Sequence, residues 1–167
     1  MNSKTEPVQD IKRRRDGVLN AYVNRIPFFK YLGITFERKG DELTGVLTYS
    51  PKLIGNAVVS RLHGGGTSAF LESTATMTLG WKSVWDAMES GEFDLEADDI
   101  KLPPLPKTIS ITTDYLRPGL PRDAYARATI TRAGRRYASV QVEAWQDNRD
   151  TLFAQSTLHF LMPGAKS

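Results

Sequence analysis

A single carboxylate in an otherwise uncharged stretch is the residue best placed for chemistry. Glu72 is the only charged residue among the 18 from Gly64 to Trp81, where the others are small, hydroxyl-bearing or apolar. We expect this stretch to form a helix that is buried on nearly all sides, where an unpaired carboxylate is costly unless it is used. No Lys or Arg stands three or four residues from Glu72 to pair with it. Glu72 is therefore a candidate general base; the alternative is a carboxylate that reaches water at a helix edge or pairs with a distant arginine.

The second feature is His63 followed by three glycines, residues 64–66. Glycine lets the backbone approach a ligand closely, and the first N–H groups of a helix have no partner inside the helix. Together with the positive end of the helix dipole, these N–H groups can stabilise a carbonyl oxygen that gains negative charge. We expect the triplet to lie directly before the helix and to act in this way. The alternative is a flexible turn that only leads the chain into the helix.

The spacing of these two features predicts an oligomer. Glu72 lies nine residues after His63, which is about 13 Å along a helix. One chain would hold the base and the carbonyl-binding N–H groups rather far apart for one substrate. A two-fold dimer would instead place Glu72 of one subunit near Gly65 of the other.

Hydrophobic periodicity indicates the helices that position these residues. Residues 8–31 repeat apolar side chains at helical spacing, and Pro27 marks a place where that helix ends or kinks. A second helix is expected directly after the glycine triplet, from Thr67 to about Lys82. Residues 84–106 are acidic, end in a proline-rich run and are interpreted as an inserted loop, although residues 84–90 can also continue the helix.

Alternating side chains indicate the strands. The expected strands are residues 33–39, 43–49, 108–115, 124–132, 137–145 and 151–162, with a loop at 50–62. The last four follow one another at about ten-residue spacing, which predicts an antiparallel meander. The order of elements indicates an α+β fold, in which one sheet wraps a long helix.

Composition limits the remaining possibilities. The chain has 167 residues and a mass of 18.6 kDa, which suits one domain over residues 1–167. It has no cysteine, so disulfides, thiolate metal sites and cysteine nucleophiles are excluded. The only histidines, His63 and His159, are too far apart in sequence to suggest a metal site. There is no signal-peptide pattern and no membrane-length apolar run, so a cytoplasmic location is expected.

The charges do not identify a partner. The net charge is +3, and seven acidic and no basic residues fall within residues 83–99. Residues 12–15 (KRRR) can be read as an arm that binds nucleic acid or a membrane. Asp10 and Asp16 flank this run, so we interpret it as a solvated helix face and expect neither partner.

Three short motifs resemble those of the PaaI-type hotdog acyl-CoA thioesterases. Residues 63–65 (HGG) with Glu72 resemble the family's HGG-x6-[D/E] signature. Residues 114–119 (DYLRPG) resemble its YLRP strand end, and residues 132–135 (RAGR) resemble its R-x-G-R hairpin. The loop at Gly55-Asn56 is most similar to the YigI-like branch of the family. The motifs stand in the family's order, and the resemblance covers most of the chain.

This resemblance implies a hotdog fold, in which a curved antiparallel sheet surrounds a central helix, here with an additional N-terminal helix. It also implies dimers, often dimers of dimers, that hydrolyse acyl-CoA thioesters; CoA is then part of the substrate, and no cofactor is expected. Glu72 takes the role of general base or nucleophile, and both remain open. The N–H of Gly65 takes the role of carbonyl polariser. The further residues implied for the site are His63, Asn56, Gly64, Gly66 and Thr108.

Arginines at strand ends are candidates for binding the phosphates of CoA, because guanidinium groups match phosphate geometry. They are Arg117, Arg132, Arg135 and Arg136. For each of these arginines taken alone, the alternative is a role in solubility or in protecting a sheet edge.

The acyl group is expected to be of medium or long chain. Residues 84–106, with Trp85, Phe93 and Leu95, are hypothesised to cover the pocket that binds it.

Three other functions would require different features of the sequence. A hotdog hydratase or dehydratase would need a different arrangement of histidine and carboxylate, and the His-Phe-Pro sequence of acyl-carrier-protein dehydratases is absent. A non-catalytic acyl-CoA-binding or sensor module would keep the fold and the arginines but would not need Glu72. A lipase-type esterase would need a G-x-S-x-G motif, which this chain lacks.

Overall fold

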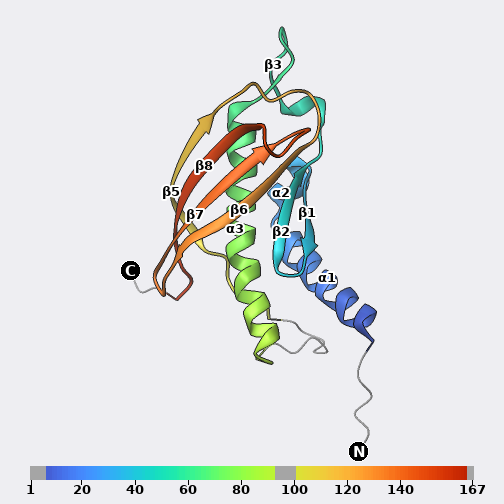
Figure 1. The fold of residues 1–167 in the computed structure, drawn as a ribbon, viewed down its shortest axis with the longest axis vertical. Coiled ribbons are helices and arrows are strands. Elements are labelled where there is room, and N and C mark those ends of the chain that lie inside the picture. Colours follow the sequence, from blue (N-terminus) through green and yellow to red (C-terminus); the bar gives the residue numbers. More distant parts are fainter. Residues whose placement is uncertain (1–6, 93–100, 165–167) are drawn as a thin grey trace, which may run out of the picture.

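The chain folds as a curved antiparallel sheet around one long helix, as seen in a computed structural model that describes residues 7–92 and 101–164 (Figure 1). The helix, α3 (Gly64–Glu89), packs against the concave face of the sheet. Two further helices, α1 (Val8–Asn24) and α2 (Pro27–Leu32), lie beside the first two strands. This arrangement confirms the expected α+β hotdog fold with an additional N-terminal helix.

The sheet has six strands in the order β1-β2-β6-β7-β8-β5. They are β1 (Ile34–Lys39), β2 (Glu42–Leu47), β5 (Lys107–Tyr115), β6 (Ala124–Ala133), β7 (Tyr137–Trp145) and β8 (Leu152–Leu161). Only β6, β7 and β8 form the expected meander. The expectation that β5 begins it was wrong, because β5 pairs with β8 at the edge of the sheet, with Thr113 opposite Ser156. Alternation reveals which face of a strand is buried but not which strand lies beside it.

Small side chains on the inner face of the sheet allow α3 to approach closely. Five alanines of β6, β7 and β8 are fully buried there: Ala124, Ala126, Ala138, Ala144 and Ala154. Phe70, Leu71, Met77 and Trp81 of α3 are also fully buried. Dense packing of this kind fixes the position of α3 relative to the strands.

Helix α3 is longer at both ends than the sequence indicated. The glycine triplet forms its first turn instead of preceding it, because the N–H of Thr67 donates to the carbonyl of His63 at 2.9 Å. At the other end the helix continues to Glu89, so the first part of the expected inserted loop at 84–106 is helical. Val84 is buried and Trp85 packs against Trp81, which explains this continuation. Residues 93–100 lie outside the described residues, and with them Phe93 and Leu95.

The expected helix over residues 8–31 is divided in two. Proline cannot continue the hydrogen bonding of α1, and Pro27 opens α2. Helix α1 is attached to the far end of α3: Arg15 forms an ion pair with Glu89 at 2.5 Å and lies over the ring of Trp85 at 4.4 Å. The ring of Trp85 is thus covered by α1, which argues against the acyl-pocket role hypothesised for it.

The segment expected as a loop at 50–62 contains regular structure. A short helical turn, Pro51–Leu53, leads into β3 (Ile54–Asn56) and β4 (Arg61–Leu62). These two strands form a small hairpin that projects beyond the start of α3 (Figure 1). Among the described residues, no helix is long and apolar enough to span a bilayer.

Candidate active site

The start of α3 is organised around His63. Its imidazole Nδ1 accepts a hydrogen bond from the N–H of Gly65 at 2.9 Å, so His63 is the N-cap of the helix. Its backbone is held on both sides: its N–H donates to the carbonyl of Leu53 at 2.8 Å, and its carbonyl accepts from Thr67. The N–H of Gly65, expected to bind the substrate carbonyl, is therefore occupied by the imidazole.

Two glycines make room for the His63 ring. A Cβ added at Gly55 would lie 2.7 Å from the His63 Cα and 2.8 Å from its ring Cδ2. A Cβ added at Gly65 would lie 3.0 Å from both Nδ1 and Cε1 of the ring. A side chain at position 55 would overlap both the backbone and the ring of His63, and one at position 65 would crowd the imidazole.

Glu72 lies on a stripe of α3 that the chain itself leaves open. The residues of this stripe are Gly65, Ser68, Glu72 and Thr76, all of which are partly or fully exposed. The expectation of a helix buried on nearly all sides is wrong for this stripe, because only one sheet covers the helix. Within the part of the chain that the structure describes, the carboxylate of Glu72 has no hydrogen bond and no ion pair. It is available to a water molecule or a substrate.

The edge strand β5 is pinned beside this stripe. The hydroxyl of Tyr115 donates to the carbonyl of Gly64 at 2.7 Å. The hydroxyls of Ser68 and Thr113 are 3.1 Å apart, and Thr113 is 2.8 Å from the hydroxyl of buried Ser156. Sequence reasoning missed Ser68 and Thr113. The alternation of β5 was the available signal, because it places Thr113 on the same inward face as Tyr115.

Two predicted site residues lie elsewhere in the single chain. Thr108 stands opposite Phe160, near the end of β5 away from Tyr115, so it is remote from the start of α3. The side-chain oxygen of Asn56 accepts from the N–H groups of Val58 at 3.1 Å and Val59 at 3.4 Å. Asn56 therefore closes the turn of the projecting hairpin.

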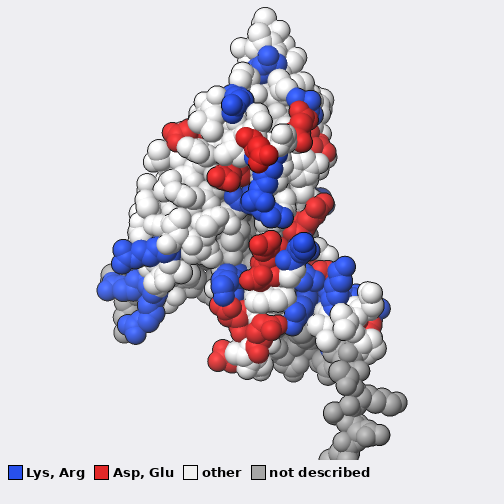
Figure 2. Space-filling model, viewed as in Figure 1, with Lys and Arg blue, Asp and Glu red and all other residues white. Residues whose placement is uncertain are grey.

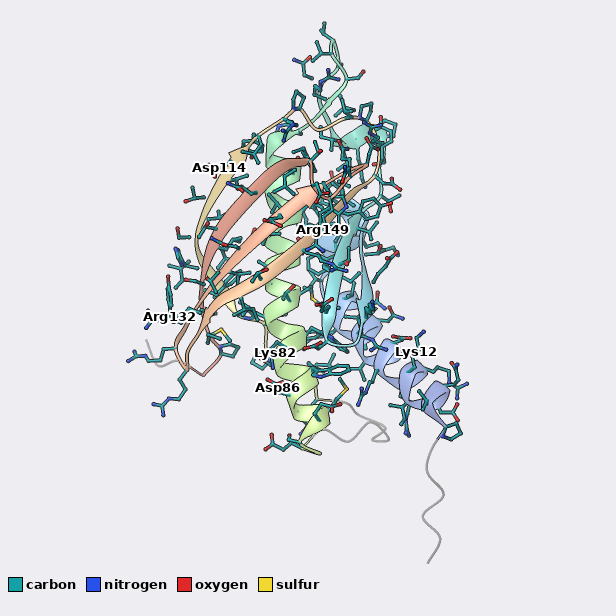
Figure 3. The ribbon with its side chains drawn as sticks, viewed as in Figure 1. Lys12, Lys82, Asp86, Asp114, Arg132 and Arg149 are labelled. Carbon is teal, nitrogen blue, oxygen red and sulfur yellow. The ribbon has the colours of Figure 1, made fainter. Side chains whose placement is uncertain are left out.

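The predicted arginines fall at two ends of the sheet. Arg132, Arg135 and Arg136 belong to the exposed β6–β7 hairpin, and Figure 3 shows Arg132 at the opposite end of the sheet from Asp114. In Figure 2 this corner carries a group of basic side chains with no acidic side chain beside them on the face in view. Arg117 is near the other end, where it donates to the carbonyl of Leu152 at 2.6 Å. It lines a cavity of about 240 Å³.

The site thus combines a free carboxylate with donors at the start of the same helix. The chain matches the family described as the acyl-CoA thioesterase N-terminal domain over residues 56–161, which include α3, β5 to β8, His63 and Glu72. The chain belongs to that family. It is a thioester hydrolase that acts on acyl-CoA, and its PaaI-type hotdog fold agrees with this activity.

Individual relatives support the same assignment. The medium/long-chain acyl-CoA thioesterase YigI of Escherichia coli K12 is 28% identical over 144 residues, which is 86% of this chain and 89% of the relative. The YigI protein of Salmonella typhimurium is also 28% identical, over 145 residues.

Two solved structures illustrate the likeness of fold. A Chromobacterium violaceum protein is 30% identical, with a TM-score of 0.61 over 95% of this chain and 100% of the other. The PaaI protein of the E. coli phenylacetic acid degradation operon is 14% identical, with a TM-score of 0.68 over 92% of this chain and 96% of the other. At that identity PaaI shows the shared fold alone.

Proposed function

We propose that this thioesterase hydrolyses medium- or long-chain acyl-CoA to the free acid and CoA, with Glu72 as general base. The observation that carries the proposal is the free carboxylate of Glu72 on the open stripe of α3. The chain-length preference is supported by the two YigI relatives, which are named for medium- and long-chain substrates. We also propose that the enzyme works in the cytoplasm.

In the proposed reaction, Glu72 removes a proton from a water molecule, and the water oxygen adds to the thioester carbonyl carbon. Negative charge gathers on the carbonyl oxygen, where hydrogen-bond donors at the start of α3 stabilise it. The tetrahedral intermediate then collapses, the C–S bond breaks, and the CoA sulfur leaves with the proton that Glu72 had accepted. The products are the carboxylic acid and the CoA thiol.

We propose that the active unit is a two-fold dimer joined along β5. An edge strand has unpaired backbone groups, and this one also exposes apolar side chains. Ile109 is 58% exposed, Tyr115 is 55% exposed and Ile111 is 37% exposed. A second copy placed there would cover both this edge and the open stripe of α3. It would also bring Glu72 toward the partner's Gly65.

The same pairing explains the scattered arginines and Thr108. In a two-fold pair of β5 strands the two chains run in opposite directions, so the β6–β7 hairpin of one subunit lies at the end where α3 of the other begins. Arg132, Arg135 and Arg136 of the partner would then reach CoA phosphates at this subunit's site. Thr108 of the partner would approach the same end, and Arg117 would contribute from this subunit.

A hydrolysis profile tests the proposed substrate. Release of the CoA thiol would be followed for short, medium, long and aromatic acyl-CoAs, and we expect the highest kcat/KM for medium or long chains. A maximum at aromatic or short acyl groups would contradict the chain-length proposal.

The dimer is tested with Ile111→Glu, which we expect to produce monomers in sedimentation and to abolish hydrolysis; an active monomer would exclude a shared site.

A further inference from the structure

We infer that Leu79 and Leu102 limit the length of the acyl chain, because residues 101–106 cross the open stripe of α3 and close it at Leu79. We call residues 101–106 the strap. The inference rests on the proposed function and names the residues that decide its chain-length preference. It narrows the expectation that residues 84–106 cover the acyl pocket to the last part of that range.

The open stripe of α3 is interrupted at one position. Beyond Glu72 and Thr76, the next residues on the same side of the helix are Leu79 and Ser83. Leu79 is only 2% exposed, whereas Thr76 before it is half-buried and Ser83 after it is exposed. Another segment of the chain must therefore lie across α3 at the level of Leu79.

The strap is held at this level on the side of α1. The guanidinium group of Arg25 donates to two backbone carbonyl oxygens of the strap, at 3.3 and 3.2 Å. Arg25 also lies over the ring of Tyr22, 5.7 Å from its centroid. That ring in turn contacts Gly80, which follows Leu79 in α3. The beginning of the strap is thus fixed beside the buried position of the stripe.

The strap reaches β5 at the same level. The hydroxyl contacts described above place the end of β5 beside the start of α3. From Thr113 back to Lys107, where the strap ends, β5 covers about 20 Å. Helix α3 covers about the same distance from Ser68 to Trp81. The strap joins these two sides of α3, so it has to cross the stripe close to Leu79.

Apolar side chains gather where the strap crosses the helix. Leu102 and Leu105 are half-buried against the hydrophobic core, and Pro106 is buried. On β5, the side chain of Ile111 is 37% exposed and points to the same face as Thr113. The closed end of the stripe therefore presents hydrocarbon, which favours a ligand that buries apolar surface.

The proposed dimer directs the acyl chain toward this end. The β6–β7 hairpin of the partner subunit would bind the CoA phosphates near the start of α3, so CoA lies on that side of Glu72. The acyl chain leaves the carbonyl carbon in the opposite direction, toward Thr76 and Leu79. Helix α3 advances about 10 Å between Glu72 and Leu79. With C–C bonds of about 1.5 Å, an extended chain advances about 1.3 Å per carbon, so about eight carbons fill this length.

Substitutions of Leu102 test the limit through a series of saturated acyl-CoAs. In the unaltered enzyme we expect kcat/KM to rise about fourfold with each buried carbon, up to about eight carbons, and then to level off. Leu102→Ala should raise the ratio of kcat/KM for dodecanoyl-CoA to that for octanoyl-CoA about tenfold, because further carbons are buried. Leu102→Trp should move the levelling-off to shorter chains. An unchanged profile in either variant would overturn this inference.

Two further variants complete the test. Arg25→Met keeps a side chain of similar length but cannot donate to the strap, so its profile should shift as that of Leu102→Ala does; an unchanged profile would exclude the strap as the closing element. Ile130→Ala is the matched control, since Ile130 is also half-buried against the core but lines a cavity with Thr78 on another side of α3. Its profile should match that of the unaltered enzyme, and a shift equal to that of Leu102→Ala would overturn the inference. Failure of the unaltered, folded protein to hydrolyse any acyl-CoA would instead overturn the proposed function.

Discussion

The phenol ring of Tyr22 on α1 lies directly against Gly80 in the middle of α3. A Cβ added at Gly80 would come within 2.6 Å of both Cε1 and the hydroxyl oxygen of Tyr22. Tyr22 is fully buried, its hydroxyl has no hydrogen-bond partner within residues 7–92 and 101–164, and burial raises its pKa to about 12. The contact joins the N-terminal helix to the central helix and leaves one polar group unsatisfied.

Replacing Tyr22 by Phe should stabilise the protein. The substitution keeps the ring and removes a buried hydroxyl that has no partner in the described part of the chain, and such a group typically costs about 1–3 kcal/mol. We expect the midpoint of urea unfolding at neutral pH to rise. A lower midpoint would show that the hydroxyl has a partner in solution.

The same substitution should remove a loss of stability at alkaline pH. In the unfolded chain Tyr22 ionises near its ordinary pKa of 10, whereas in the folded protein it remains protonated up to about 12. Ionisation of Tyr22 therefore favours the unfolded state as the pH rises from 10 toward 12. The free energy of unfolding falls over this range, and below pH 10 it is not reduced by this ionisation. The free energy of unfolding, measured with urea at several pH values between 10 and 12, should fall less steeply with pH for Tyr22→Phe than for the unaltered protein. Parallel pH profiles for the two proteins would contradict the assignment.

Gly80→Ala should be destabilising, by about 1–3 kcal/mol, because Tyr22 has no space to move away. Gly17→Ala is the matched control, since Gly17 lies in α1 and nothing stands within 4 Å of its added Cβ. The control should gain about 0.5–1 kcal/mol from better helix propensity. Chemical unfolding of both variants measures the difference, and equal effects would argue against the close contact.

Glu72→Gln should lower kcat about 100- to 10,000-fold while acyl-CoA still binds, because the amide cannot accept the proton from water. Glu89→Gln is the matched control on the same helix: its ion pair with Arg15 is remote from the start of α3, so kcat should be unchanged. Steady-state rates and equilibrium binding of acyl-CoA provide the comparison. Full activity in Glu72→Gln would exclude the proposed base.

A single turnover in ¹⁸O-water tests the role of Glu72 as general base. As general base, it directs solvent oxygen into the fatty acid during the first turnover. As nucleophile, it would form a mixed anhydride with the acyl group, and attack of water on the Glu72 carbonyl of that anhydride would leave a Glu72 oxygen in the first product. We expect mass spectrometry of the released acid to show the label from the outset, and an unlabelled first product would exclude Glu72 as general base.

The combined substitution of Arg132 and Arg135 by Gln should raise KM for acyl-CoA by about tenfold or more, with little change in kcat. The effect should disappear for an acyl-pantetheine substrate, which has no nucleotide phosphates for the guanidinium groups to bind. Arg13→Gln, an exposed arginine on α1, serves as the control. An equal rise in KM for acyl-CoA and for acyl-pantetheine would show that these arginines do not bind the nucleotide of CoA.

Much of the fold was predictable because burial alternates along its strands. In β7 the inward positions Ala138, Val140 and Val142 are buried, and their neighbours are less so, which made its bounds readable from the sequence alone. The partner of β5 was not predictable in this way. Nothing in the pattern of residues 107–115 distinguishes a strand beside β6 from one beside β8.

In the site, the residue types in the sequence identified the candidate residues, but the hydrogen bonds between them could not be predicted. The isolation of Glu72 identified it as a candidate, and the structure shows its carboxylate without a partner in the described chain. The occupation of the Gly65 N–H by His63 depends on one side-chain rotamer, which the sequence does not specify. The glycine triplet was expected before the helix, whereas the helix capped by His63 begins at Gly64 and includes it.

The attachment of α1 to the last turns of α3 has a practical consequence. His63 and Trp85 are separated by nearly the whole of α3, about 30 Å. The chain has no cysteine, and the side chain of Arg13 on α1 is 82% exposed. Arg13→Cys would supply a unique thiol on α1, on the side of the molecule away from β5 (Figure 1), where a fluorophore or a solid support can be coupled away from the proposed dimer contact.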